Sequence, residues 1–425
     1  STMKSAGFSL LGRRTAEPPI SWLMKMTLER PKLISLAAGF TDRASLPVRE
    51  VGEILHEILF QPKVARSALQ YGSTTGDETL RRLTMERLQA GDGLLQDEAG
   101  AYSPRQLLIT HGSQQLLYLL TECLCDPGDI ILVEDPTYFV FLGIVQSHGL
   151  RCRGLRLQSD GLDLARLEAV LGSLKKSGGL ARVKMLFMVS YFQNPSGVTT
   201  SLEKKRAALE LLRSYESAAG HPIYLIEDAA YRDLRFAGDD VPSALAVPGF
   251  GDRVIYAGTY SKPFATGIRV GYGRLPESLF TVINRVKGNH DFGTSNLLQQ
   301  VLRQGLSSGR YDQHLALLRR RYRKKARVMV EALQEHFPKN IQWEAPRGGL
   351  YVWARLPRAL SAGTKSRLFQ KALSKDVLYV PGELCYAPDA TRRLPRNEMR
   401  LSFGSAGETE IRTGIARLGQ VLRTL

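Results

Sequence analysis

Lys262 is the residue of this chain that most clearly indicates chemistry. It follows a strand-like apolar run; two hydroxyl residues, Thr259 and Ser261, come just before it, and Arg269 follows seven positions later. A lysine held beside hydroxyls and another cation can lose its proton near neutral pH, because the second positive charge disfavours the ammonium form. The neutral amine is a nucleophile that forms Schiff bases with carbonyl compounds. The segment therefore predicts covalent chemistry at Lys262.

A carboxylate that suits the same chemistry, Asp228, ends the apolar run 222–228. Lys262 lies 34 positions later, which leaves room for a strand end, a connection and the next strand of a doubly wound sheet. A buried carboxylate can keep a heterocyclic nitrogen protonated, so that the ring accepts electrons. Alone, Asp228 would more often be a turn or capping residue. Its spacing from Lys262 favours the catalytic interpretation.

A candidate anion site lies earlier, where the strand-like run 106–110 leads into a helical pattern over residues 112–124. Gly112 allows close approach of a ligand to the backbone, and Ser113 is expected to be the N-cap. Free N–H groups and the positive end of the helix dipole meet at such a start. The segment therefore predicts a phosphate site.

Residues 256–273, YAGTYSKPFATGIRVGYG, resemble the SK-x-x-x-x-G-x-R-x-G-[YF] signature of fold-type I pyridoxal-phosphate-dependent aminotransferases of class I/II. The resemblance extends from about Ile34 to Phe403. It implies that pyridoxal 5'-phosphate forms an aldimine with Lys262 and that Asp228 faces the pyridine nitrogen. The remaining cofactor-binding residues that it implies are Ser113, Gln114, Tyr138, Asn194, Tyr231, Thr259, Ser261 and Arg269.

The resemblance also implies a role for several of these side chains. Ser113, Gln114 and Arg269 bind the phosphate, and the ring of Tyr138 stacks on the pyridine. Asn194, in an NPSG turn, and Tyr231 hydrogen-bond the phenolic oxygen of the cofactor. Near the end of the chain, MRLSF resembles the MR-[LV]-x-F pattern, which implies that Arg400 grips the substrate α-carboxylate. A guanidinium fork suits that planar anion better than a lysine does.

Four further stretches, LISLAAGFTDRASLP, LQYGSTTGDETLRRL, PRGGLYVW and VLYVPGELCY, resemble the kynurenine and α-aminoadipate aminotransferase branch and the cofactor domains of MocR-type regulators. The branch implies that Gly39 contacts the substrate through its backbone and that Tyr71 reaches the phosphate of a neighbouring subunit. A homodimer is therefore expected. Only about 30 residues precede ISLAAGF, too few for the DNA reader of a MocR-type regulator, so a ligand-sensing role is the less favoured reading.

The substrate is indicated by the segment PPISWLMKM. Aminoadipate-type enzymes commonly have an arginine where this chain has Ser21, and Trp22 and Leu23 follow. A lid of this composition suits an apolar or aromatic amino donor, with Ser21 and Trp22 on the substrate side and 2-oxoglutarate as a plausible acceptor. The alternative is that Trp22 only anchors the arm. A β-lyase or synthase on the same scaffold also stays open, because the sequence does not determine which bond at Cα breaks.

The apolar runs predict an α/β fold with a mostly parallel, seven-stranded sheet in a large domain and a smaller α+β domain. The expected divisions are an N-terminal arm over residues 1–45, a cofactor-binding domain over 46–305 and a small domain over 306–425. The ligand site is expected between the domains, at strand ends. The strands expected in the large domain are 106–110, 129–135, 183–190, 222–228, 254–261 and 269–275.

Composition favours a soluble, cytoplasmic enzyme without membrane, metal or nucleic-acid partners. No apolar run reaches 18 residues, and the first ten residues lack the apolar core of a signal peptide. Four cysteines and seven histidines lack metal-ligand spacing. The excess of 58 basic over 41 acidic residues is concentrated partly in 315–337, where Leu315, Leu318, Tyr322, Ala326 and Val330 form an apolar stripe opposite Arg320, Arg323, Lys324 and Arg327. This pattern predicts a solvated helix face.

Overall fold

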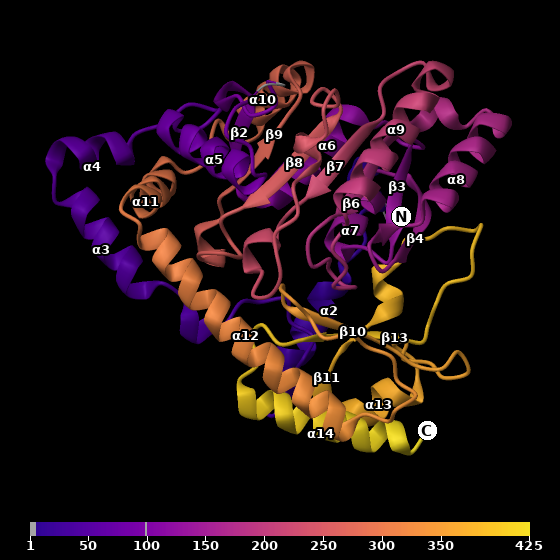
Figure 1. The fold of residues 1–425 in the computed structure, drawn as a ribbon. Helices are drawn as coiled ribbons and strands as arrows, with labels where there is room; N and C mark the ends of the chain where they lie inside the picture. The colour runs from indigo at the N-terminus through magenta and orange to yellow at the C-terminus, as the bar shows by residue number, and fades with distance from the viewer. Residues whose placement is uncertain (1–5, 98–99) are drawn as a thin grey trace.

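The computed structural model describes residues 6–97 and 100–425, and a large twisted sheet is its central feature (Figure 1). The strand order is β2-β9-β8-β7-β6-β3-β4-β5. The neighbours from β8 through β4 pair in parallel, whereas β9 is antiparallel to both β8 and β2. The six strands whose ranges were predicted are present, and β4 completes the expected seven. An eighth, the two-residue β5, pairs antiparallel with β4 at the edge of the sheet.

The large sheet comprises β2 (Leu107–Thr110), β3 (Ile130–Asp135), β4 (Arg151–Gln158), β5 (Gly161–Leu162), β6 (Val183–Val189), β7 (Tyr224–Asp228), β8 (Val254–Thr259) and β9 (Gly271–Arg274). Its helical surroundings are α3 (Val48–Leu59), α4 (Pro62–Leu69), α5 (Glu78–Gly91), α6 (Gly112–Leu124), α7 (Phe139–Ser147), α8 (Leu164–Ser177), α9 (Leu202–Ala219), α10 (Glu277–Asp291) and α11 (Asn296–Ser307).

The sheet is buried on both faces, which explains its nearly continuous apolar strands. Successive residues of β2 contribute to different cores: Leu107 and Ile109 belong to one hydrophobic cluster and Leu108 to the other. This alternation follows from the two-residue period of a strand. Parallel strands place their carboxyl ends at one edge, so residues that end β6, β7 and β8 lie close together.

A smaller unit contains the remaining strands: β1 (Ile34–Ser35), β10 (Tyr351–Arg355), β11 (Val377–Leu378), β12 (Val380–Pro381) and β13 (Glu398–Ser402). β10, β13 and β12 form an antiparallel sheet, and β1 pairs in parallel with β11. The helices are α12 (Arg310–His336), α13 (Arg367–Ser374) and α14 (Glu408–Arg423). Helix α12 begins beside α11 of the large unit and packs along α14 (Figure 1). We propose that this unit is the small domain, divided as expected near residues 45 and 305.

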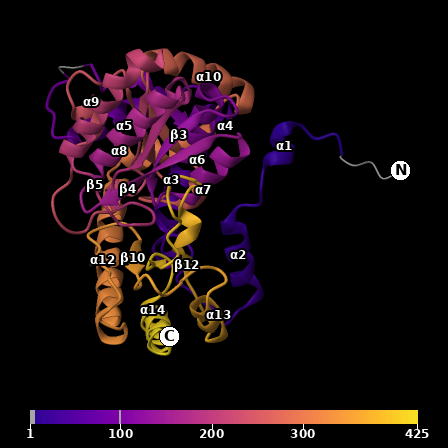
Figure 2. The same cartoon turned by 90° about the vertical axis from the view of Figure 1, so that its right-hand side faces the viewer.

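The N-terminal arm contacts both units through its two helices, α1 (Leu10–Arg14) and α2 (Pro19–Glu29), which stand at one side of the molecule in Figure 2. Arg14 Nε donates to the carbonyl oxygen of Ser147 in α7 at 3.1 Å. In α2, the ring of Trp22 stacks on Phe369 of α13 with centroids 5.7 Å apart, and Leu23 is buried. Trp22 thus anchors the arm to the small unit.

Helix α12 has the two faces that its sequence predicts. Leu315, Leu318, Tyr322 and Ala326 are buried, Val330 is partly buried, and Arg320, Arg323, Lys324 and Arg327 are exposed. Arg323 uses its guanidinium to donate two hydrogen bonds to the carbonyl oxygen of Phe236. Part of the basic sequence is therefore used to fix the helix against the large unit. None of the helices in the described residues is long and apolar enough to span a membrane.

Candidate active site

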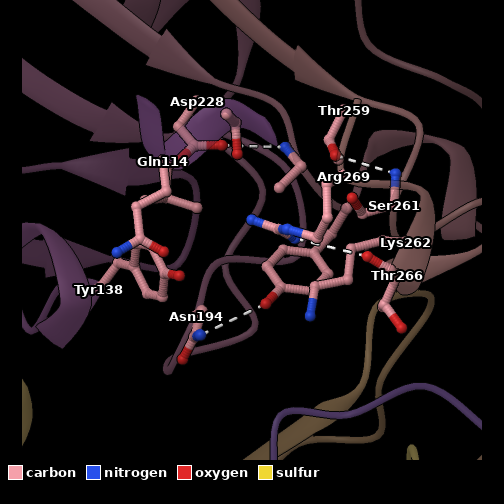
Figure 3. Close-up of a pocket in the computed structure, with 13 residues that line it drawn as sticks. Gln114, Tyr138, Asn194, Asp228, Thr259, Ser261, Lys262, Thr266 and Arg269 are labelled. Carbon is pink, nitrogen blue, oxygen red and sulfur yellow. Dashed lines mark hydrogen bonds between the residues drawn. The ribbon is translucent and has the colours of Figure 1, made fainter. Parts of the chain in front are cut away.

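A pocket of about 610 Å³, partly open to solvent, lies at the carboxyl ends of β6, β7 and β8. Side chains from the sheet, from the start of α6 and from the loop after β8 point into it (Figure 3). The residues that line it are Ser113, Gln114, Tyr138, Val189, Asn194, Asp228, Ala230, Tyr231, Thr259, Ser261, Lys262, Thr266 and Arg269. The structure thus brings together residues from five separate segments that the sequence singled out.

Lys262 lies in the loop that follows β8, three residues after the strand ends. Its Nζ donates a hydrogen bond to the carbonyl oxygen of Gly39 at 2.8 Å. Burial lowers the pKa of Lys262 to about 8, and the positive charges of Arg400 and Arg269 act in the same direction. A substantial fraction of this amine is therefore neutral, and nucleophilic, at mildly alkaline pH.

Asp228 is the last residue of β7. Its Oδ1 accepts a hydrogen bond from the backbone N–H of Ala230 at 3.0 Å, which fixes the carboxylate at the pocket wall. Burial raises the pKa of Asp228 to about 6, partly opposed by that hydrogen bond and by the charge of Lys262. A buried carboxylate in this position stabilises a cationic partner, because no water screens the attraction.

The expected anion site is present where β2 leads into α6. Gly112 has φ +71°, and a Cβ at this position would lie 2.7 Å from Arg269 Nη2. A Cβ on Gly271 would likewise lie 2.6 Å from the backbone nitrogen of Ser113. The two glycines therefore let the helix start and the arginine approach each other. Ser113 is not the N-cap, which corrects the prediction: α6 begins at Gly112 with His111 at the N-cap position, so Ser113 lies in the first turn.

Arg400 lies beside this pocket, in the middle of β13, with 1% of its surface exposed. Its Nη1 donates to Asn194 Oδ1 at 2.7 Å and its Nη2 to the carbonyl oxygen of Ala37 at 2.6 Å. The buried Nε has no hydrogen-bond partner among the described residues. The guanidinium also stacks over two rings, 4.3 Å from the centroid of Tyr351 and 5.4 Å from that of Phe139.

Three predicted residues are placed away from the pocket wall. Tyr71 is 81% exposed and contacts the ring of Phe292 edge-on. Ser21 and Trp22 are not among the pocket residues, and Trp22 faces Phe369 instead. Gly39 approaches the site through its carbonyl oxygen, the atom that Lys262 contacts.

Sequence reasoning missed four residues of the site: Val189, Ala230 and Thr266 line the pocket, and Tyr351 lies behind it. Thr266 is inside the SK-x-x-x-x-G motif, and Ala230 directly precedes Tyr231, so the motifs contained a signal for both. The Tyr351 hydroxyl lies 2.9 Å from that of Tyr231, across 120 positions of sequence. No local pattern predicts that contact.

The donor set fits pyridoxal phosphate. The cofactor has an aldehyde, a basic ring nitrogen and a phosphate ester, and the pocket offers an amine of lowered pKa in Lys262, the carboxylate of Asp228, and Arg269 at a helix start. Ser261 Oγ is buried without a hydrogen-bond partner among the described residues, as expected of a group meant for a ligand. Among those residues, no cluster of three or more histidine, cysteine or acidic side chains could hold a metal.

This sheet order and this lysine, carboxylate and arginine arrangement define a fold-type I pyridoxal-phosphate-dependent enzyme. Residues 31–418 match the family model described as aminotransferase class I and II. The chain is 34% identical to aromatic-amino-acid aminotransferase 1 of Thermococcus litoralis, over 97% of this chain and 93% of that protein. It is 32% identical to the 2-aminoadipate transaminase of Thermus thermophilus, over 99% and 98%.

Among solved structures, the Pyrococcus horikoshii kynurenine aminotransferase in complex with PMP, KYN and KYA is similar, with a TM-score of 0.87 and 31% identity over 98% of this chain and 97% of that one. The chain belongs to the class I and II aminotransferase family. It is a pyridoxal-phosphate-dependent transaminase that acts on amino acids.

Proposed function

We propose that the enzyme transfers the α-amino group of an aromatic or apolar amino acid to a 2-oxo acid such as 2-oxoglutarate. The observation that carries this proposal is the distribution of charge and aromatic rings. Of the residues that line the pocket in the described chain, only Lys262 and Arg269 are cations, and both have cofactor roles. Tyr138, Phe139 and Tyr351 lie around Arg400 and offer apolar surface. Among these residues, no further cation is available that would make a carboxylate-bearing donor preferable to an aromatic or apolar one.

Arg400 binds the substrate α-carboxylate in this proposal. Its Nη1 contact with Asn194 and its stacking on Tyr351 hold the guanidinium plane in one orientation, which suits a planar anion. The unpartnered Nε is free to donate to that anion. Burial strengthens the attraction between the two charges.

Pyridoxal phosphate, when bound, supplies a carbonyl that condenses with amines and a ring that withdraws electrons from Cα. With the cofactor bound, the neutral Lys262 Nζ would take the proton from the substrate Cα and deliver it to the cofactor. Asp228 would keep a proton on the ring nitrogen. Ser113, Gln114 and Arg269 would bind the phosphate, Tyr138 would cover one ring face, and Asn194 and Tyr231 would hydrogen-bond the phenolic oxygen. Thr259 and Ser261 would also contact the cofactor.

The proposal includes a homodimer in which Tyr71 reaches the phosphate of the partner subunit. Large apolar side chains are exposed along α3, α4 and the segment after them, namely Val48, Leu59, Phe60, Val64, Leu69 and Tyr71. Exposed apolar surface on this scale is typical of a protein interface. Sedimentation equilibrium tests the dimer, and a Y71F variant with unchanged phosphate affinity would count against the role of Tyr71.

The half-reaction tests the function directly. The holoenzyme is mixed with single amino acids and no oxo acid, while the cofactor absorbance and oxo-acid release are recorded. One oxo acid per site, formed fastest from phenylalanine, tyrosine or leucine among the candidate donors, supports the proposal, and preference for aminoadipate overturns the substrate class. Reaction with glutamate is expected in either case, because it is the reverse of the 2-oxoglutarate half-reaction. Catalytic release of pyruvate or ammonia would indicate the lyase alternative. The expected cytoplasmic location is part of the same proposal, and cell fractionation tests it.

A further inference from the structure

Two buried tyrosines face each other beside the pocket, and only one of them lines it. The hydroxyl oxygens of Tyr231 and Tyr351 are 2.9 Å apart. Tyr231 lines the pocket, whereas Tyr351, in β10, lies behind it and stacks under Arg400. Asn194 Nδ2 lies within hydrogen-bond distance of both hydroxyls, at 3.3 Å and 3.4 Å.

The direction of each hydrogen bond in this group follows from Arg400. A guanidinium only donates, so the Asn194 atom that faces Arg400 Nη1 is the amide oxygen, and the amide nitrogen faces the tyrosines. Toward either hydroxyl, Asn194 can therefore only donate, and one of its two N–H bonds remains for the phenolic oxygen when the cofactor is bound. Burial raises the pKa of Tyr231 well above its ordinary value, so this phenol keeps its proton.

The remaining choice is which tyrosine donates to the other. Within the described part of the chain, the hydrogen-bond neighbours of the Tyr351 hydroxyl are Tyr231 and Asn194, and Asn194 offers it only an N–H. The Tyr351 proton is therefore satisfied only by pointing at Tyr231. The Tyr231 hydroxyl lines the pocket, so it can also point its own proton into that pocket.

We propose that Tyr351 is a positioning residue: its hydroxyl donates to Tyr231 and thereby directs the Tyr231 proton into the pocket, toward the phenolic oxygen of the cofactor. The inference rests on the proposed cofactor role of Tyr231. A hydroxyl that accepts a hydrogen bond becomes a better donor, because the bonds of a chain polarise one another. Through Asn194, the same group connects the carboxylate-binding Arg400 to the cofactor edge.

The test is the Y351F variant, which removes one oxygen and keeps the ring that stacks under Arg400. Its matched control is Y379F: Tyr379 is also fully buried in the small unit, and its hydroxyl donates a single 2.9 Å bond to the carbonyl oxygen of Ala362. The absorbance of each reconstituted holoenzyme is titrated with pH in the absence of substrate, and thermal unfolding of each variant is recorded.

A weaker donor at the phenolic oxygen leaves that oxygen more basic, so the protonated chromophore persists to higher pH. We expect the titration midpoint of Y351F to rise by about 0.5, the effect of weakening one hydrogen bond, while that of Y379F stays at the wild-type value. In a Y231F background, Y351F should add no further change, because the residue through which it acts is gone. Both single variants should lose similar thermal stability.

An unchanged or lowered titration midpoint in Y351F overturns the proposal. An equal change of the midpoint in Y379F also overturns it, and so does a further change when Y351F is added to Y231F. The titration requires no substrate. A wild-type enzyme that fails the amino-acid half-reaction would therefore refute the proposed substrates without affecting this result. If Y231F itself leaves the midpoint unchanged, the assumed role of Tyr231 is wrong and the inference falls with it.

Discussion

Lys262 Nζ donates a hydrogen bond to the carbonyl oxygen of Gly39, which lies 223 positions earlier in the chain. Two residues before Gly39, the carbonyl oxygen of Ala37 accepts from Arg400. One short stretch that follows β1 therefore contacts both the Lys262 amine and the arginine that is proposed to bind the substrate carboxylate. A Cβ on Gly39 would lie 2.9 Å from the Tyr351 hydroxyl, so this close approach depends on glycine.

The lowered pKa of Lys262 predicts how capture of the cofactor depends on pH. Burial and two nearby cations bring this pKa to about 8, so below that pH the neutral amine falls about tenfold per pH unit. The rate at which apoenzyme captures pyridoxal phosphate should rise with pH and level off above about 8. Stopped-flow absorbance measures it. A rate still rising steeply between pH 9 and 10 would show an unperturbed lysine.

The close approach at Gly112 predicts a specific defect in G112A. Alanine would carry a Cβ into Arg269 Nη2 and would also have to adopt φ +71°. We expect affinity for the cofactor to fall at least about tenfold, or 1.4 kcal/mol, because the arginine must move. Fluorescence titration of apoenzyme measures the affinity.

G220A is the matched control for that variant. Gly220, at the end of α9, has φ +81° but no atom within 4 Å of the added Cβ. Both variants should lose about 1–2 kcal/mol of stability from the left-handed backbone, whereas only G112A should lose cofactor affinity. Equal affinity losses in the two variants would contradict the proposed phosphate site.

Replacing Arg400 by lysine should weaken carboxylate binding more than it weakens folding. Lysine cannot contact Asn194 and Ala37 while presenting a planar fork to a substrate. We expect kcat/KM to fall about 100-fold, near 2.7 kcal/mol, with normal cofactor absorbance. R274K serves for comparison: the equally buried Arg274 donates only to the backbone carbonyl oxygens of Ala101, Gly251 and Val254. An R400K enzyme with unchanged kinetics would exclude the carboxylate role.

The ion pair between Lys205 and Glu227 predicts a large effect on stability. The two charged atoms are 2.8 Å apart, both side chains are fully buried, and Glu227 directly precedes Asp228 in β7. K205M should destabilise the protein by about 3–5 kcal/mol, because it leaves a buried carboxylate unpaired. The double variant K205M/E227L should recover much of that loss. Urea unfolding of the apoenzyme measures both; a K205M variant within about 1 kcal/mol of wild type would contradict the expectation.

The sequence predicted those parts of the site that depend on short segments. Lys262, Asp228 and Asn194 each follow or end a buried strand, and parallel strands carry such positions to one edge of the sheet. The family and the cofactor followed from the same motifs. Motif spacing was sufficient because each functional residue occupies a fixed place relative to its own strand.

Contacts between distant segments were not predictable in this way. The pairing of Tyr351 with Tyr231 depends on how the small sheet packs against the large one. The sequence left open whether Trp22 covers the substrate or anchors the arm, and in the structure its ring stacks on Phe369 of α13. Composition alone does not distinguish a lid residue from an anchor, because both are large, apolar and at the start of a helix.

The site combines segments of the chain that are synthesised far apart in time. Ala37 and Gly39 come from its beginning, and Arg400 comes from its end. The strands from β2 to β9, which bear Asp228 and position Lys262, leave the ribosome well before β13 does. The residues proposed to bind the cofactor are therefore all synthesised before Arg400, which is proposed to bind the substrate carboxylate. Under the proposed roles, the residue that binds the substrate carboxylate is the last part of the site to be synthesised, and a chain cut before β13 would lack it.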